Sequence, residues 1–182
     1  MESSVPHILR QLLFFRQPTQ VRFPGGPVSI KAYQIIVWIS VTESTQSQLE
    51  PTTPRVPAIL DTGHTHNLSI REEQLMQWAR VNPRLLPPLR RIRVSGQQVT
   101  LFEANIWLHP NRYGMRDEFT PGPPYSLELG GGIAVFPDTM SIAPRLPLIG
   151  LRSLVQAKLH LSLDGRNCRV SIRTKRRFWF LG

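Results

Sequence analysis

Proline and glycine interrupt this sequence so often that long helices have little room to form. The chain has 182 residues, of which 17 are proline and 12 are glycine, and both types disfavour the interior of a helix. Short runs of β-branched and aromatic residues lie between these breaks, and residues 28–41 predict one long strand or two short ones. The pattern predicts a single, mostly β domain with one or two short helices.

Apolar runs bounded by turn residues predict most of the strands. The turn Ser95-Gly96-Gln97 is flanked by two such runs and predicts a hairpin, and Asp164-Gly165 predicts a second, closing hairpin. In chain order, the runs that predict these and the remaining strands are residues 56–60, 92–94, 99–108, 133–136, 146–150, 159–163 and 168–172.

The clearest helix signal follows residue 68. Ser69 and Glu72 have the spacing of a capping box, which predicts a helix that starts at Ser69 and carries Leu75, Met76 and Ala79 on one face. A second helix of one or two turns is predicted after residue 150.

The chain divides into an arm and a domain. Residues 1–27 are expected to form an N-terminal arm, in which residues 5–16 are either a short amphipathic helix or a segment that packs on a partner. Residues 28–182 are expected to form the domain. Residues 109–131 are rich in proline, glycine and charge, which predicts a surface insertion.

Composition excludes several classes of protein. The longest apolar stretches, "YQIIVWISV" and "ILRQLLFF", are far shorter than the ~20 residues of a membrane span. The N-terminus lacks the basic and apolar regions of a signal peptide. Cys168 is the single cysteine, so no internal disulfide can form, and a reducing compartment is expected. We therefore expect a cytoplasmic protein without a membrane span.

The net charge of +10 raises the question of nucleic acid. Basic residues are mostly scattered, with clusters only at 90–93 and 175–177, and no phosphate-binding glycine loop, zinc spacing or RNA-binding aromatic motif accompanies them. A solvated basic surface is the favoured interpretation. No cofactor is expected, and a nucleic-acid partner is the weaker alternative, to be tested by salt-dependent binding.

Residues 58–67, "AILDTGHTHN", hold the side chains with the clearest chemistry. His64 and His66 follow a glycine, as in metal-binding turns of metallophosphoesterases. A dinuclear metal site needs several further ligands, yet no aspartate and only His7 precede Asp61. No metal site is therefore expected here.

Asp61-Thr62-Gly63 suggests the catalytic turn of an aspartic protease. Such an enzyme needs two carboxylates about 3 Å apart that share one proton and hold a water molecule. Gly63 lets the backbone turn tightly, and the Thr62 hydroxyl can be buried to hold the loop rigid.

Several motifs together resemble the retropepsin-like aspartic proteases of the retrotransposon type. "ILDTGHTHN" matches the active-site pattern of that family except at His64, where the family has a small residue. "LPLIGLRSL" resembles its apolar strand beneath the catalytic loop, with Leu148, Ile149 and Gly150 in the matching positions, and "RVSGQQV" lies where the family has its flap. The resemblance covers roughly residues 28–173.

The resemblance implies a closed β fold and a symmetric homodimer, because the chain carries one Asp-Thr-Gly triplet and the mechanism needs two aspartates. It implies an endopeptidase in which each chain supplies Asp61. His64 and the flap residues Ser95, Gly96 and Gln97 would line a groove for a peptide or protein substrate. The terminal segments "ILRQLLFF" and "RRFWFLG" are candidate interface elements or simply core edges.

Two alternatives stay open. His64 could fill the groove, which would leave a catalytically silent member of the fold that acts in dimerisation or peptide binding. The weaker alternative is the basic nucleic-acid-associated protein considered above.

Overall fold

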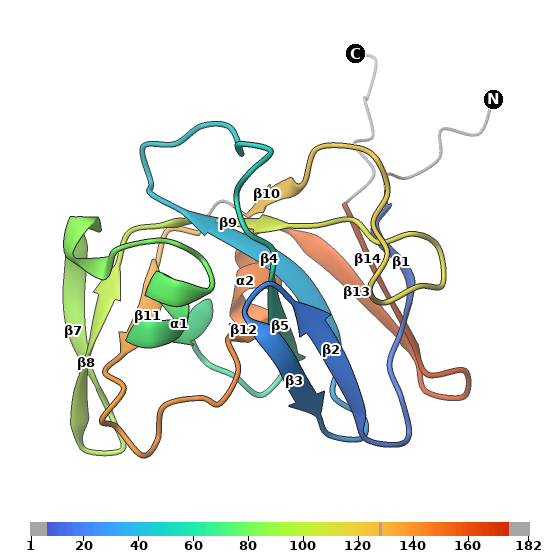
Figure 1. Cartoon of the computed structure of the whole chain (residues 1–182), viewed down its shortest axis with the longest axis horizontal. Helices are drawn as coiled ribbons and strands as arrows, with labels where there is room; N and C mark the ends of the chain where they lie inside the picture. Colours follow the sequence, from blue (N-terminus) through green and yellow to red (C-terminus); the bar gives the residue numbers. More distant parts are fainter. Residues whose placement is uncertain (1–6, 128, 175–182) are drawn as a thin grey trace, which may run out of the picture.

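Strands dominate the computed structural model, which describes residues 7–127 and 129–174. They form a nine-stranded, a three-stranded and a two-stranded sheet. In Figure 1 the three-stranded sheet lies at the right, and a long hairpin of the largest sheet lies at the left edge. The prediction of a single, mostly β domain is confirmed.

The nine-stranded sheet carries the Asp61 motif near its middle. Its end strands, β10 and β7, are not paired with each other in the described residues. In spatial order the strands are β10 (Tyr125–Leu127), β9 (Asn105–Leu108), β4 (Ile36–Thr42), β5 (Val56–Asp61), β12 (Leu148–Gly150), β6 (Leu68–Arg71), β11 (Ile133–Phe136), β8 (Gln97–Phe102) and β7 (Pro88–Val94).

Strand β12 lies between two strands that are consecutive in the chain. It runs parallel to β5 and antiparallel to β6, so the turn at 62–67 must cross from one neighbour of β12 to the other. A strand with neighbours on both sides in the middle of a sheet is buried, which explains its short apolar sequence. This arrangement places the turn over the end of β12.

The N-terminal segment is a strand and not a helix. β1 (His7–Leu13) pairs with β14 (Arg169–Thr174), which in turn pairs with β13 (Leu159–Asp164). The side chains of Leu9 and Leu12 are buried in the main core, so most of this apolar segment is not offered to a partner. The β13–β14 hairpin confirms the predicted closing hairpin, whereas "RRFWFLG" lies outside the described residues.

A separate hairpin joins this segment to the large sheet. β2 (Thr19–Phe23) and β3 (Gly26–Ile30) pair around the turn at Pro24 and Gly25. Residues 28–41 therefore belong to two strands, β3 and β4, which was one of the two alternatives predicted.

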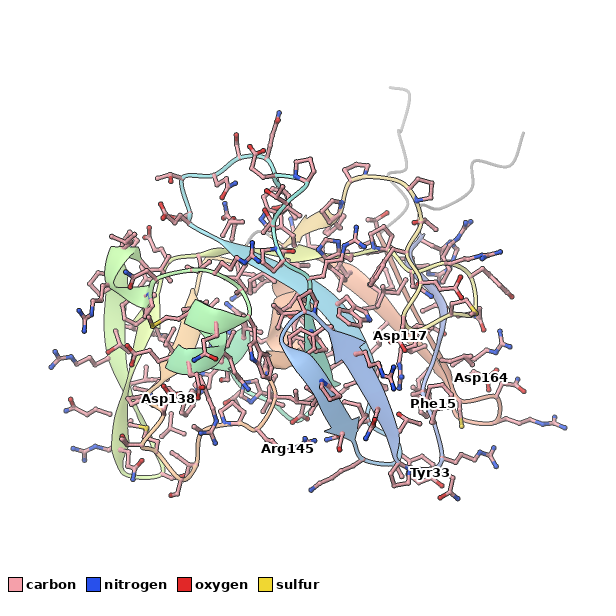
Figure 2. All side chains as sticks on the ribbon, viewed as in Figure 1. Phe15, Tyr33, Asp117, Asp138, Arg145 and Asp164 are labelled. Atoms are coloured by element: carbon pink, nitrogen blue, oxygen red, sulfur yellow. The ribbon has the colours of Figure 1, made fainter. Side chains whose placement is uncertain are left out.

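The helices are short, and the first starts later than predicted. α1 (Glu72–Gln77) is preceded by Arg71 as its N-cap, because Ser69 belongs to strand β6. The backbone N–H of Glu73 donates to the carboxylate of Asp138, labelled in Figure 2. Met76 is half exposed and does not share the buried face of Leu75. The other helices are a 3₁₀ turn, η1 (Pro83–Leu85), and α2 (Leu151–Gln156), which was predicted.

The predicted surface insertion at 109–131 is partly built into the molecule. Asn111 is buried, and its side chain exchanges hydrogen bonds with the backbone of Arg10 in β1. Arg116 is also buried, and it pairs with Asp117, labelled in Figure 2. Buried polar groups are tolerated when they are fully partnered, which sequence patterning alone does not reveal.

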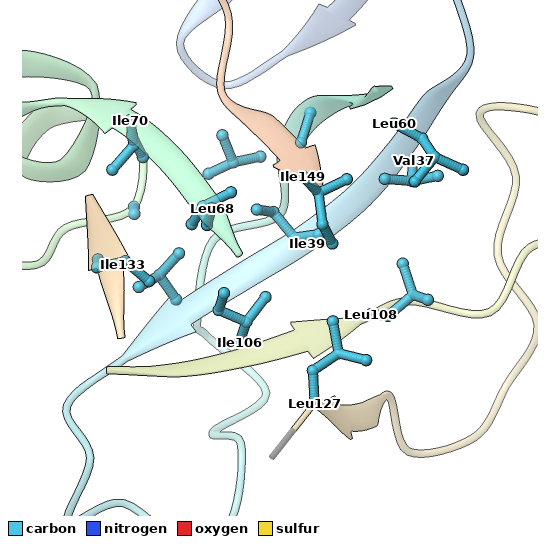
Figure 3. Close-up of a cluster of buried hydrophobic side chains, with 14 of the residues drawn as sticks. Val37, Ile39, Leu60, Leu68, Ile70, Ile106, Leu108, Leu127, Ile133 and Ile149 are labelled. Atoms are coloured by element: carbon cyan, nitrogen blue, oxygen red, sulfur yellow. The ribbon is translucent and has the colours of Figure 1, made fainter. Parts of the chain in front are cut away.

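One hydrophobic core joins the strands of the large sheet. Figure 3 shows buried side chains from several of its strands in a single cluster. All of the labelled residues are at most 5% exposed, namely Val37, Ile39, Leu60, Leu68, Ile70, Ile106, Leu108, Leu127, Ile133 and Ile149. No helix in residues 7–127 and 129–174 is both long and apolar enough to cross a membrane.

Candidate functional site

Asp61 is the last residue of β5, and the first turn after it orients its carboxylate. Its Oδ1 atom accepts a hydrogen bond of 2.9 Å from the backbone N–H of Gly63. The backbone N–H of His64 donates to the Asp61 carbonyl oxygen at 3.2 Å. The carboxylate is partly exposed, and these contacts hold the turn around it without covering it.

Gly150 supports this turn from below. It lies directly beside Asp61 in the parallel pairing of β12 with β5, and its N–H donates to the carbonyl oxygen of Asn67 at 3.0 Å. A Cβ atom added at Gly150 would overlap the carbonyl oxygen of His66 and lie 2.7 Å from that of His64. A residue without a side chain is therefore required here by the close approach of the turn.

The expected reason for a glycine at position 63 is wrong. The φ angle of Gly63 lies outside the left-handed region, and an added Cβ atom would meet only Asp61 Oδ1, at 3.4 Å. Gly63 therefore leaves space beside the carboxylate and is not needed for the shape of the turn. Thr62 is exposed in the isolated protomer, so its hydroxyl is not buried there as expected.

His64 is tied to strand β6. Its Nε2 atom lies 2.8 Å from the hydroxyl of Ser69, a fully buried residue. Burial lowers the pKa of His64, the positive charge of His66 lowers it further, and Asp61 acts in the opposite direction. The imidazole is consequently neutral at pH 7 and serves as a hydrogen-bond partner inside the turn.

His66 packs its ring edge-to-face on His64, with ring centroids 5.4 Å apart. Burial lowers the pKa of His66, and the positive charges of Arg152 and Arg90 lower it further. Within the described ranges, no group of three His, Cys, Asp or Glu side chains is placed to hold a metal ion.

The predicted hairpin is formed by β7 and β8. Ser95 and Gly96 both have positive φ angles, 47° and 84°, as a two-residue type I′ turn requires. Ser95, Gly96 and Gln97 are exposed at its tip. The base of the hairpin approaches the Asp61 turn, because Arg90 and Ile92 line one recess together with Thr65 and His66.

The structure thus brings Gly150 beside Asp61 and close to the carbonyl oxygen of His64, whereas Leu148 and Ile149 pair with Ile59 and Leu60 in the strand that precedes the turn. Sequence reasoning missed three supporting residues: Ser69, Asn67 and Arg152. The Ser-x-x-Glu spacing led to the prediction that Ser69 caps a helix, which is wrong. The family pattern included an Asn at position 67, but it did not indicate that the carbonyl oxygen of Asn67 binds Gly150.

Comparison of the chain with protein-family models, with curated proteins and with solved structures gives no significant match.

Proposed function

We propose that the chain is a retropepsin-like aspartic endopeptidase that works as a symmetric homodimer. The observation that carries the proposal is the pairing of two motifs far apart in the sequence: Asp61 at the end of β5 lies beside Gly150 at the end of β12. The resemblance implies this relation, with an apolar-apolar-glycine strand running beneath an Asp-Thr-Gly turn.

The proposed reaction is hydrolysis of a peptide bond by an activated water molecule. In the dimer, one Asp61 carboxylate accepts a proton from water while the other, protonated, polarises the substrate carbonyl. Two carboxylates about 3 Å apart cannot both ionise easily, so they share one proton. The space beside Asp61 at Gly63 would let the substrate approach the dyad.

The geometry of His64 supports an open groove. In the silent alternative, its imidazole fills the space where substrate would lie. The bond to Ser69 instead holds the ring against β6, and the ring is neutral at pH 7. Position 64 is therefore compatible with the catalytic alternative.

Dilution tests the shared dyad. Hydrolysis of a peptide library should depend on dimer formation, so the activity per chain should fall at concentrations where sedimentation shows dissociation. Constant activity per chain in a monomeric sample would exclude a dyad made from two Asp61 residues.

Asp61→Asn tests the chemistry itself. Asn has nearly the same shape but cannot act as a base, so hydrolysis should be lost while the circular dichroism spectrum and unfolding midpoint stay close to wild type. Asp164→Asn, in the exposed β13–β14 turn, is the matched control and should retain activity. A wild-type dimer that binds peptides without cleaving any would support the silent alternative.

A further inference from the structure

A small recess lies between the Asp61 turn and the base of the β7–β8 hairpin. Its volume is about 150 Å³, which is enough to hold one amino-acid side chain but not a larger ligand. The turn, the hairpin, the segment before β11 and the helix α2 all contribute to its wall. The lining residues are Thr65, His66, Asn67, Arg90, Ile92, Leu101, Gly131, Gly132 and Arg152.

The recess is positively charged. Arg90 comes from β7 and Arg152 from α2, and both lie close enough to His66 to lower its pKa. Among residues 7–127 and 129–174, no acidic residue lines the recess and neither arginine forms an ion pair. The ion pairs found there are Arg112 with Glu118 and Arg116 with Asp117. The cationic charge is thus left without a partner inside the described protomer.

The other walls suit the aliphatic part of a short side chain. Ile92 on β7 and Leu101 on β8 are apolar and both line the recess, with Leu101 paired opposite Arg90. Gly131 leaves the far wall open, because an added Cβ atom there would lie 3.0 Å from the Asn67 amide nitrogen. Asn67 is buried, and its amide donates to the carbonyl oxygen of Gly132 at 3.3 Å, which fixes the floor.

We propose that this recess is a specificity subsite that binds the carboxylate side chain of a glutamate or aspartate in the peptide substrate. The proposal rests on the proposed protease function. Two guanidinium groups from different elements can each donate two hydrogen bonds to a carboxylate. Because the recess begins at Thr65, a few residues beyond Asp61, the bound side chain belongs to a substrate residue near the cleaved bond.

Binding is tested first, without any need for cleavage. The full-length chain, labelled with ¹⁵N, is titrated at pH 7 with acetyl-Ala-Glu-Ala-amide and with the matched acetyl-Ala-Gln-Ala-amide. The NMR signals of His66 and of the Arg90 and Arg152 side chains should shift with both peptides, but half of the full shift should be reached at an at least tenfold lower concentration of the glutamyl peptide. Equal shifts with both peptides, or no shift with either, would overturn the proposal.

Two substitutions locate the effect. Arg152→Gln should remove the preference for glutamate. Arg91→Gln is the control and should keep the preference, because Arg91 is exposed and lies next to Arg90 on β7 but does not line the recess. Loss of the preference in both variants would show general charge attraction and would overturn the subsite.

Cleavage then separates this proposal from the protease function. Wild-type cleavage of a peptide library should enrich Asp and Glu at one position, and Arg90→Glu with Arg152→Glu should shift that position toward Lys and Arg. Asp61-dependent cleavage without acidic enrichment would overturn the subsite and leave the protease function intact. Preferential binding of the glutamyl peptide by a chain that cleaves nothing would keep the recess as a carboxylate site and reject the protease function.

Discussion

The Asp61 turn and the β7–β8 hairpin both depend on a glycine, but in opposite ways. At the turn, the backbone lies so close to Gly150 that no side chain fits. At the hairpin tip, a Cβ atom added to Gly96 would meet nothing within 4 Å. The first region is held by contact with its neighbours, whereas the second is defined only by its own backbone conformation.

The polar side chains follow the same division. In the turn, the Asp61 carboxylate accepts from Gly63 and the His64 ring bonds Ser69. In the hairpin, the arginines at positions 90, 91 and 93 are exposed. A catalytic group gains from fixed geometry, and a segment that closes over substrate gains from freedom to move, so the proposed protease would require a difference of this kind between its active-site turn and its flap.

Gly150→Ala should have the largest effect on stability. The new methyl group would overlap backbone atoms of the turn, which cannot move away as a flexible side chain can. Since β12 lies between β5 and β6, the strain should spread through the middle of the sheet. We expect a loss of about 3 kcal/mol or more in the free energy of unfolding, measured with urea.

Gly165→Ala is the control for that measurement. Gly165 lies in the β13–β14 turn, has no left-handed φ angle, and an added Cβ atom there would meet nothing. Its substitution should change stability by less than about 1 kcal/mol. Similar values for both variants would mean that the turn is not packed as tightly as the comparison requires.

The second largest effect on stability should appear at acidic pH, and it depends on a buried histidine outside both regions. His109 lies on the opposite part of the large sheet, with Nε2 2.8 Å from the Ser40 hydroxyl. Burial, helped by the positive charge of Arg55, lowers the pKa of His109 to about 4 from its ordinary value of 6.5. Between these values the unfolded chain binds more protons, so the free energy of unfolding falls as the pH falls through this window.

The loss due to His109 should approach about 3 kcal/mol at pH 4. Urea unfolding at pH 7 and pH 4 measures it, and His109→Gln, which can still bond Ser40, should reduce the loss by most of that amount. An unchanged acid loss in His109→Gln would assign it to other groups. Protonation of His109 lowers the stability of the whole fold. Its contribution must therefore be subtracted before the stabilities of the turn and the hairpin are compared at acidic pH.

Local sequence patterns were enough to predict most strands, because an apolar run that ends at a polar residue or a glycine can be read within a few positions, as in β5 and β12. The hairpin was equally local, because Ser95-Gly96 suits a type I′ turn. The pairing of β5 with β12 did not follow from those patterns and was implied only by the family resemblance.

Long-range contacts decided the features that were predicted wrongly. Ser69 has the spacing of a helix cap, but β6 pairs with β11 and β12, and those partners outweigh the local capping signal. Similarly, the amphipathic segment of β1 forms a strand and not a helix, because it pairs with the edge of β14. The recess at Arg90 and Arg152 combines side chains more than sixty positions apart, so no spacing rule could indicate it.

His64→Ala should have an intermediate effect, restricted to the turn. If the proposed protease function holds, the resemblance implies higher activity for this variant, because the family has a small residue at this position. The structure adds a cost, since the buried Ser69 hydroxyl would lose its imidazole partner. We expect stability to fall by about 1–2 kcal/mol. Amide hydrogen exchange should quicken in residues 61–71 and stay unchanged in the hairpin.

His160→Ala is the control, because His160 is exposed on β13. It should leave exchange in both regions unaltered. If His64→Ala quickens exchange in the hairpin as much as in the turn, the two regions are one cooperative unit and the comparison fails.

Gly96→Ala should have the smallest effect on stability and still lower turnover. With φ at 84° and open space around the Cβ position, the substitution costs only backbone strain, about 1 kcal/mol. Gly26→Ala is the matched control: Gly26 has φ at 104°, equally open space, and lies in the β2–β3 hairpin instead. Both variants should lose similar stability in urea.

If the β7–β8 hairpin closes over substrate, Gly96→Ala alone should reduce kcat/KM several-fold, because the tip must change its backbone conformation as it closes. Equal kcat/KM in the two variants would show that the tip does not move during turnover, and the contrast between a fixed turn and a mobile hairpin would lose its functional meaning.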